Sequence, residues 1–223
     1  WCGHVANVDG LGKKGFEDAL ADYRRPRRKG DKQHLRLTDK MADSRSPMML
    51  YGVPVGKMFF QGAPRLMKSG LSILPCRPKK DRRIVLEAYP ALVARRWRKQ
   101  GYKSDTKKKQ TLAQWAARQV IVKGLMSNGF QGMYGFGLDL DSEQTGIMIE
   151  DKSGDRLDAL LCAIQAAWAY RNSDNNYGIP GDIDAVLPVP LHWRRRWFRG
   201  FNQAHEIGRP VARYLGLSLI NGV

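Results

Sequence analysis

Three acidic residues stand where an apolar segment ends or begins, and their types suit metal binding. Glu87 follows the apolar residues 84–86, and Asp155 and Asp158 lie one helical turn apart at the start of the apolar segment 157–170. A buried carboxylate is costly unless a positive charge offsets it. Carboxylate oxygens suit Mg²⁺ or Mn²⁺, and two such ions can stabilise the displacement of a phosphodiester oxygen. Glu87, Asp155 and Asp158 are therefore predicted metal ligands and catalytic residues.

Each acid also has a simpler interpretation. Asp155 would occupy the first turn of a helix, where the helix dipole favours an acid. Glu87 could pair with one of the many arginines. Asp158 lies deeper in its helix and precedes the apolar run 159–164, so capping explains it less well.

Regular elements are needed to position these acids, and the sequence predicts several. Residues 82–90 are typical of a buried central strand, because Ile84, Val85 and Leu86 form an apolar run that Pro90 ends. Residue 153 is a serine that could cap the helix after it. The remaining predicted elements are helices at residues 15–23, around 58–67, at 106–127 and at 155–171. The helix at 106–127 is expected to be amphipathic, with Arg118 near its polar face and, near its apolar face, Leu112, Trp115, Ala116, Val122 and Met126.

Composition indicates a folded protein with a polyanionic partner. The 223 residues are 43% hydrophobic, and 38 Lys and Arg against 21 Asp and Glu give a net charge of +17. Such a charge suits a polyanionic partner such as nucleic acid (DNA or RNA), a nucleotide or a membrane surface. The three cysteines are far apart, and no segment reads as a signal peptide or membrane span. We therefore expect a cytoplasmic protein with no membrane partner.

Two basic segments are candidates for holding a phosphate backbone without reading its sequence. The first is a loop in residues 24–40, which carry eight positive and two negative side chains. The second lies near residues 103–109. A solvated basic surface is the alternative for both. The predicted nucleic-acid contacts are Arg24, Arg25, Arg27, Arg28, Lys32, Arg36, Lys103, Lys107, Lys108 and Lys109.

Several separate blocks resemble a bacterial family of predicted RNase H-like nucleases whose function is otherwise unknown. The blocks are LTDKMADSRSPMMLYGVPVGKMFFQGAPRL, SILPCRP, RIVLEAYPALVARR, YKSDTKKKQ and SGDRLDALLCAIQAAWA. The resemblance covers residues 1–183 and implies an α/β fold, an RNase H-like mixed sheet with flanking helices. It also implies metal ligands at the end of a strand, matching Glu87, and on a late helix, matching Asp155 and Asp158.

The same resemblance implies a further aspartate on the first strand. Asp9, in NVDGLG, is a poor substitute because turn-forming residues flank it. We therefore expect that strand upstream of Trp1, so that residues 1–183 would form a nuclease domain lacking its N-terminal strands and much of its activity.

The C-terminal residues resemble a second family. VPVPL, a run of arginines and RGFNQA are similar to ComF-like phosphoribosyltransferases linked to DNA uptake, over residues 184–223. The segment predicts a strand, a basic turn and a helix whose start could bind an anion through Arg199, Gly200 and Phe201. The phosphoribosyl pyrophosphate loop of that family is missing, so a basic C-terminal appendage is expected.

The sequence thus leaves three functions open. The first is metal-dependent phosphodiester hydrolysis on nucleic acid. The second is nucleic-acid binding without catalysis, in which the acids serve only structure. The third is a phosphoribosyltransferase-related role in DNA uptake.

Overall fold

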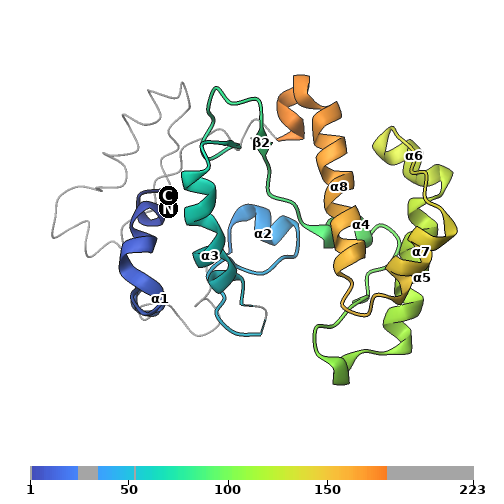
Figure 1. The fold of residues 1–223 in the computed structure, drawn as a ribbon, viewed down its shortest axis with the longest axis horizontal. Helices are drawn as coiled ribbons and strands as arrows, with labels where there is room; N and C mark the ends of the chain where they lie inside the picture. The colour runs from blue at the N-terminus through green and yellow to red at the C-terminus, as the bar shows by residue number, and fades with distance from the viewer. Residues whose placement is uncertain (1, 25–34, 53, 180–223) are drawn as a thin grey trace. The chain divides into compact units, whose positions relative to one another are not determined.

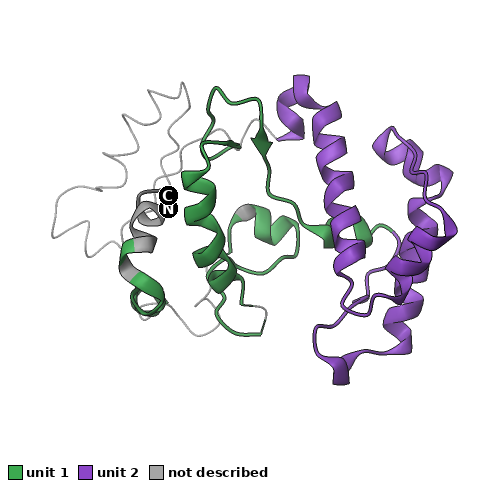
Figure 2. Cartoon of the chain, in the orientation of Figure 1, with its two compact units in different colours: residues 1–96 green, residues 97–223 purple. Residues whose placement is uncertain are grey.

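The structure, a computed structural model, describes residues 2–24, 35–52 and 54–179 (Figure 1). The chain divides into two compact units, residues 1–96 and residues 97–223 (Figure 2). The described residues are mostly helical in both units. Each unit has its own core, so each is considered separately.

The first unit packs two helices around aromatic and methionine side chains. Phe16 and Leu20 of α1 are buried together with Met48, and Phe59 and Phe60 of α3 pack against them. The predicted helices at 15–23 and around 58–67 are confirmed as parts of α1 and α3. The elements of this unit are α1 (Cys2–Arg24), α2 (Leu37–Met41), α3 (Val55–Lys68), β1 (Ser72–Ile73), β2 (Ile84–Val85) and α4 (Pro90–Ala94).

The predicted RNase H-like mixed sheet is wrong. The described residues contain one sheet, in which β1 and β2 pair in parallel with Ser72 opposite Ile84 and Ile73 opposite Val85. Residues 82–90 do not form a buried central strand, because both residues of β2 are only half-buried. Pro90 instead starts α4, where its missing N–H costs no hydrogen bond.

The second unit is a group of helices with an aliphatic core. Helix α5 packs on α7, and α7 packs on α8 (Figure 1). The predicted helix 155–171 is confirmed as α8, and the predicted helix 106–127 is mainly α5. The elements are η1 (Lys107–Lys109), α5 (Leu112–Leu125), α6 (Asn128–Tyr134), α7 (Ser142–Glu150), α8 (Asp155–Arg171) and η2 (Ser173–Gly178).

Local capping explains where α5 and α7 begin. Thr111 accepts a hydrogen bond from the Gln114 amide at 3.3 Å, and the Gln114 side chain accepts one from the Thr111 amide at 3.1 Å. Asp141 and Gln144 form the same reciprocal pair before α7. Each pair satisfies two backbone donors that a helix start leaves free. The pair at Thr111 therefore makes α5 begin at Leu112 rather than at residue 106 as predicted.

The buried face of α5 differs from the predicted one. Leu112 is 84% exposed and Ala116 is exposed, whereas Ile121 and Leu125 are fully buried. Arg118, expected on the polar face, is 2% exposed. Both faces of α5 carry apolar and polar residues, so packing against the neighbouring helices determines which face is buried.

Gly124 allows a close approach on α5. The indole of Trp97 lies against it, and a Cβ at position 124 would stand 2.1 Å from Trp97 Cδ1. Phe130 of α6 is fully buried, with its ring centroid 6.2 Å from that of Trp97 and 4.8 Å from that of Tyr134. This aromatic group fixes the end of α5 to α6.

No helix among the described residues is long and apolar enough to cross a membrane. The predicted boundary between residues 183 and 184 and the predicted strand, turn and helix of residues 184–223 lie outside the described residues.

Candidate functional site

The three predicted metal ligands are divided between the two units. Glu87 follows β2 in the first unit, while Asp155 and Asp158 occupy the first turn of α8 in the second. Asp155 is exposed, and its Oδ2 accepts a hydrogen bond from the Ser153 hydroxyl at 3.0 Å. Asp158 is half-buried, and two different side chains contact its carboxylate.

Asp158 is held by a phenol and an ammonium group from a distant part of the chain. The Tyr102 hydroxyl donates to Asp158 Oδ1 at 2.5 Å. The Lys103 ammonium donates to Oδ2 and forms an ion pair with it. Tyr102 is 7% exposed, so its hydroxyl needs a partner inside the protein. We call Tyr102, Lys103 and Asp158 the Asp158 cluster.

The segment 102–104 is positioned by side chains of α5 and of Gln110, which stands just before it. Arg118 Nη1 donates to the Tyr102 carbonyl at 2.7 Å, and Gln114 Nε2 donates to the Lys103 carbonyl at 3.1 Å. Gln110 Nε2 donates to the Ser104 carbonyl at 2.9 Å. Each of these carbonyls thus has a donor, and the segment is fixed beside the start of α8.

Arg118 connects the same segment to α7. Its Nε donates to the Ile149 carbonyl at 2.6 Å, near the end of α7, where helix carbonyls lack intrahelical partners. Burial lowers the pKa of Arg118, and the charges of Asp151 and Glu150 oppose that effect. The guanidinium therefore joins α5, α7 and the Asp158 cluster as a structural cation.

The turn between α7 and α8 brings Lys103 against the backbone. Gly154 has φ of 73°, and a Cβ there would lie 2.8 Å from Lys103 Cβ. Only glycine adopts this conformation without strain and leaves the required space. Gly154 is therefore needed for the ion pair between Lys103 and Asp158.

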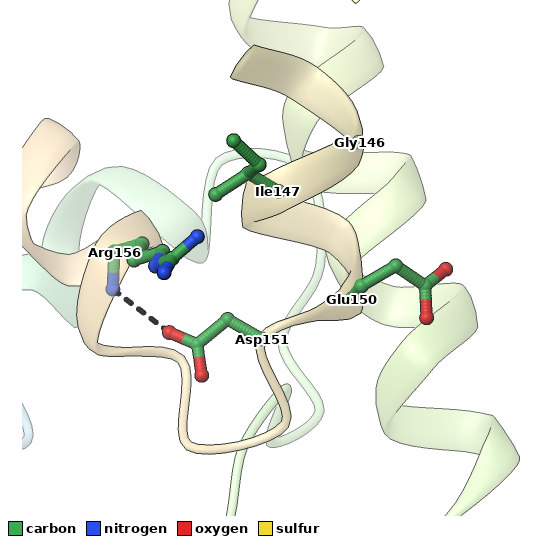
Figure 3. Close-up of a pocket in the computed structure, with 5 residues that line it drawn as sticks. All are labelled: Gly146, Ile147, Glu150, Asp151 and Arg156. Atoms are coloured by element: carbon green, nitrogen blue, oxygen red, sulfur yellow. Dashed lines mark hydrogen bonds between the residues drawn. The ribbon is translucent and has the colours of Figure 1, made fainter. Parts of the chain in front are cut away.

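Asp151, rather than the predicted Ser153, caps the start of α8 (Figure 3). Asp151 Oδ2 accepts from the Arg156 amide at 3.0 Å, and Oδ1 accepts from the Ser153 amide at 3.1 Å. Burial raises the pKa of Asp151, but these hydrogen bonds outweigh that effect and lower it. The single hydroxyl hydrogen of Ser153 is shared between Asp151 Oδ1, at 2.6 Å, and Asp155 Oδ2, at 3.0 Å.

An open hollow lies beside this cap (Figure 3). It is lined by Gly146, Ile147, Glu150, Asp151 and Arg156. Both acids in it already have partners, since Asp151 caps α8 and Glu150 Oε1 accepts from the Trp115 indole at 2.8 Å. The carboxylates of the hollow thus have structural roles at the junction of α7 and α8.

Glu87 forms an ion pair with an arginine, as the simpler interpretation anticipated. Arg36 donates to both oxygens of Glu87, at 2.8 and 2.9 Å, and to both oxygens of Asp39. Hydrogen bonds to Asp39 and then to Glu87 raise the pKa of Arg36. The Glu87 side chain is 70% exposed and that of Asp39 is 1% exposed, so Asp39 is the buried partner.

The contacts of these acids do not fit a shared divalent cation. The Lys103 ammonium contacts Asp158 Oδ2, and Arg36 donates to both oxygens of Glu87. Among the described residues, no group of three or more His, Cys, Asp or Glu side chains could hold a metal ion. Binding of Mg²⁺ or Mn²⁺ by Glu87, Asp155 and Asp158 remains a prediction from the sequence.

The predicted nucleic-acid contacts are only partly described. Lys107, Lys108 and Lys109 form η1 and are all exposed. Lys103 and Arg36 are bound to carboxylates, and Arg24 is half-buried at the end of α1. Outside the described residues lie Arg25, Arg27, Arg28, Lys32 and the predicted anion-binding residues Arg199, Gly200 and Phe201.

The sequence-based prediction of nucleic-acid contacts did not include two sets of exposed cations. Arg98 and Lys99 precede η1, and residues 98–109 carry six basic side chains against Asp105 alone. Lys79, Lys80 and Arg82 lie between β1 and β2, in a segment where residues 77–83 carry five basic side chains and one acid. A count of charges in short windows would have found both sets.

Comparison of the chain with protein-family models, with curated proteins and with solved structures gave no match.

Proposed function

We propose that this protein binds nucleic acid without catalysis and contacts the phosphate backbone through residues 98–110 of its second unit, which we call the η1 loop. The observation that carries the proposal is the uncompensated charge of this loop. Lys107, Lys108 and Lys109 are exposed and, among the described residues, form no ion pair with a carboxylate. Phosphate oxygens can supply the missing partners.

The loop is attached to the folded unit in a way that supports this role. Gln110 is bonded to the Ser104 carbonyl, and the backbone amide of Ser104 donates to the Lys152 carbonyl at 3.4 Å. Thr111 then begins α5. Because both ends of η1 are held, less conformational freedom is lost when its lysines bind a phosphate chain.

The acids support a non-catalytic function. Asp158 and Glu87 accept hydrogen bonds that join separate segments of the chain, and Asp151 accepts a local one at the start of α8. Their presence at the ends of apolar segments is thereby explained without a reaction. Hydrolysis of the bound strand through Glu87, Asp155 and Asp158 remains a prediction of the sequence resemblance, and the Asp158 variant described in the Discussion tests it.

A salt titration of binding tests the proposal. The full chain is titrated against a fluorescein-labelled single-stranded DNA and the corresponding RNA, with fluorescence anisotropy as the readout. Each phosphate contact contributes about 0.7 to the slope of log affinity against log salt for single strands. We expect the variant K107Q/K108Q/K109Q to reduce that slope by about 2.

A matched variant separates the η1 loop from net charge. Lys13, Lys14 and Lys57 are exposed in the first unit and lie outside every predicted contact segment, so K13Q/K14Q/K57Q removes the same charge elsewhere. We expect it to alter the slope much less. If wild-type protein binds neither probe, or both triple variants weaken binding equally, the η1 loop is not the contact surface.

A further inference from the structure

We infer that the first unit carries a second phosphate-contact site, formed by Lys79, Lys80 and Arg82 in residues 74–83, which we call the β1–β2 loop. This inference rests on the proposed function. Its ligand is the same chemical class, the phosphate backbone of a nucleic acid. The two sites would make one chain a bivalent ligand for a long strand.

The charge of the β1–β2 loop is uncompensated for a structural reason. Its one acid, Asp81, is already bound by Arg83, whose Nε and Nη2 donate at 3.1 and 2.8 Å. The Arg83 amide also donates to Asp81 at 2.8 Å. These hydrogen bonds lower the pKa of Asp81 to about 2, so Asp81 stays ionised and paired with Arg83 at neutral pH.

Of the four other cations in this loop, Arg77 is half-buried and three are exposed. Lys79, Lys80 and Arg82 are exposed and, among the described residues, make no ion pair with a carboxylate. They stand within four consecutive positions. Because the three cations are close together in sequence, neighbouring phosphates of a single strand can each meet one of them.

The loop that carries them is held at several points. The Lys79 amide donates to the hydroxyl of the buried Ser72 at 3.1 Å, and Ile73 and Arg77 exchange two backbone hydrogen bonds, at 2.6 and 2.9 Å. The Arg77 guanidinium donates to the Met67 carbonyl at 3.2 Å, at the end of α3. The cations are thus presented on fixed backbone, which reduces the entropy lost on binding.

Bivalency has a measurable consequence. When one site is bound, the other binds the same strand at a raised effective concentration, provided that the strand can reach both. Neutralising the cations of either loop should then weaken binding to a long strand. Each such change should also reduce the salt slope in proportion to the number of phosphates that the loop no longer neutralises.

The experiment uses the full chain, a labelled single-stranded DNA of about 40 nucleotides and the variant K79Q/K80Q/R82Q, compared with K107Q/K108Q/K109Q and K13Q/K14Q/K57Q. We expect K79Q/K80Q/R82Q to reduce the salt slope by about 2, at about 0.7 per phosphate. Thermal unfolding checks that each variant is folded; exposed side chains change stability little. If a variant unfolds, the matching single substitutions replace it.

The outcomes separate this inference from the proposed function. If K107Q/K108Q/K109Q weakens binding and K79Q/K80Q/R82Q behaves like the K13Q/K14Q/K57Q control, the β1–β2 loop is not a contact site and the proposed function stands. If the wild-type protein does not bind the strand, both fail. A reduced slope for both loop variants, beyond that of the control, supports the second site.

Discussion

Replacement of Asp158 by asparagine separates a structural carboxylate from a metal ligand. Asparagine has the same shape but no charge, so it can still accept a hydrogen bond from Tyr102 and can no longer pair with Lys103. If Asp158 is structural, the variant is less stable. Acids gathered for a metal repel one another in its absence, so removal of one charge there would stabilise the metal-free protein.

The size of this destabilisation follows from the hydrogen bonds of Asp158. A hydrogen bond to a charged group contributes about 1.5–3 kcal/mol and a neutral one about 0.5–1.5 kcal/mol, so weakening the Tyr102 bond costs about 1 kcal/mol. The Lys103 and Asp158 side chains are 36% and 22% exposed. Their ion pair therefore adds at most about 1 kcal/mol. We expect Asp158→Asn to lower the free energy of unfolding by about 1–2 kcal/mol.

Native-state hydrogen exchange of α8, read by mass spectrometry in EDTA, measures this destabilisation in the second unit itself. Tyr102→Phe should cost a similar amount, and the double variant should be destabilised by less than the sum because both changes remove one interaction. Asp155→Asn is the control, since Asp155 is exposed and contacts Ser153 alone among the described side chains. It should cost no more than about 1 kcal/mol.

Metal titration completes the test. We expect Mn²⁺ to leave the exchange of α8 unchanged in both wild-type protein and the Asp158 variant, because Lys103 already neutralises the carboxylate. The structural account of Asp158 is refuted if Asp158→Asn is more stable than wild type in EDTA. It is equally refuted if Mn²⁺ protects α8 in the wild type but not in the variant.

Two further predictions concern packing and pH. Gly124→Ala should lower stability by about 1–3 kcal/mol, because its Cβ would displace the Trp97 indole. Gly146→Ala, which has open space around it on α7, should raise stability by about 0.5–1 kcal/mol. Urea unfolding followed by tryptophan fluorescence measures both changes, and equal effects of the two variants would contradict the packing. Burial raises the pKa of Asp39, but hydrogen bonds from Arg36 outweigh it and lower the pKa below 3.8. The stability that Asp39 contributes is therefore present above pH 3.8 and lost as pH falls through its lower folded value. Protection of the first unit against hydrogen exchange, corrected for the intrinsic exchange rate at each pH, should therefore fall on acidification more in wild type than in Asp39→Asn.

Helices were the part of this protein that local sequence could predict. Residues 155–171 and 58–67 become helical because apolar residues recur at helical spacing and breakers such as Gly154 stand beside them. The reciprocal pair Asp141 and Gln144 would also have marked α7, which was not predicted. These signals act within a few residues, so no distant part of the chain is needed to interpret them.

The predicted sheet failed because a strand depends on its neighbours. Ile84 and Val85 have the residue types of a strand, yet within the described part of the chain they pair with only Ser72 and Ile73. Backbone hydrogen bonds in a sheet join separate segments, so an apolar run cannot by itself show that enough partners exist. The apolar run that predicted a central strand therefore forms one side of a two-stranded pair.

The roles of the acids were decided by contacts between residues far apart in sequence. Asp158 meets Tyr102 and Lys103 across separations of 56 and 55 residues, and Glu87 meets Arg36 across 51. The sequence by itself determined the positive charge, the helices and the positions of the acids within them. Only the tertiary structure decided which cation each acid would meet, because that choice depends on how distant segments pack.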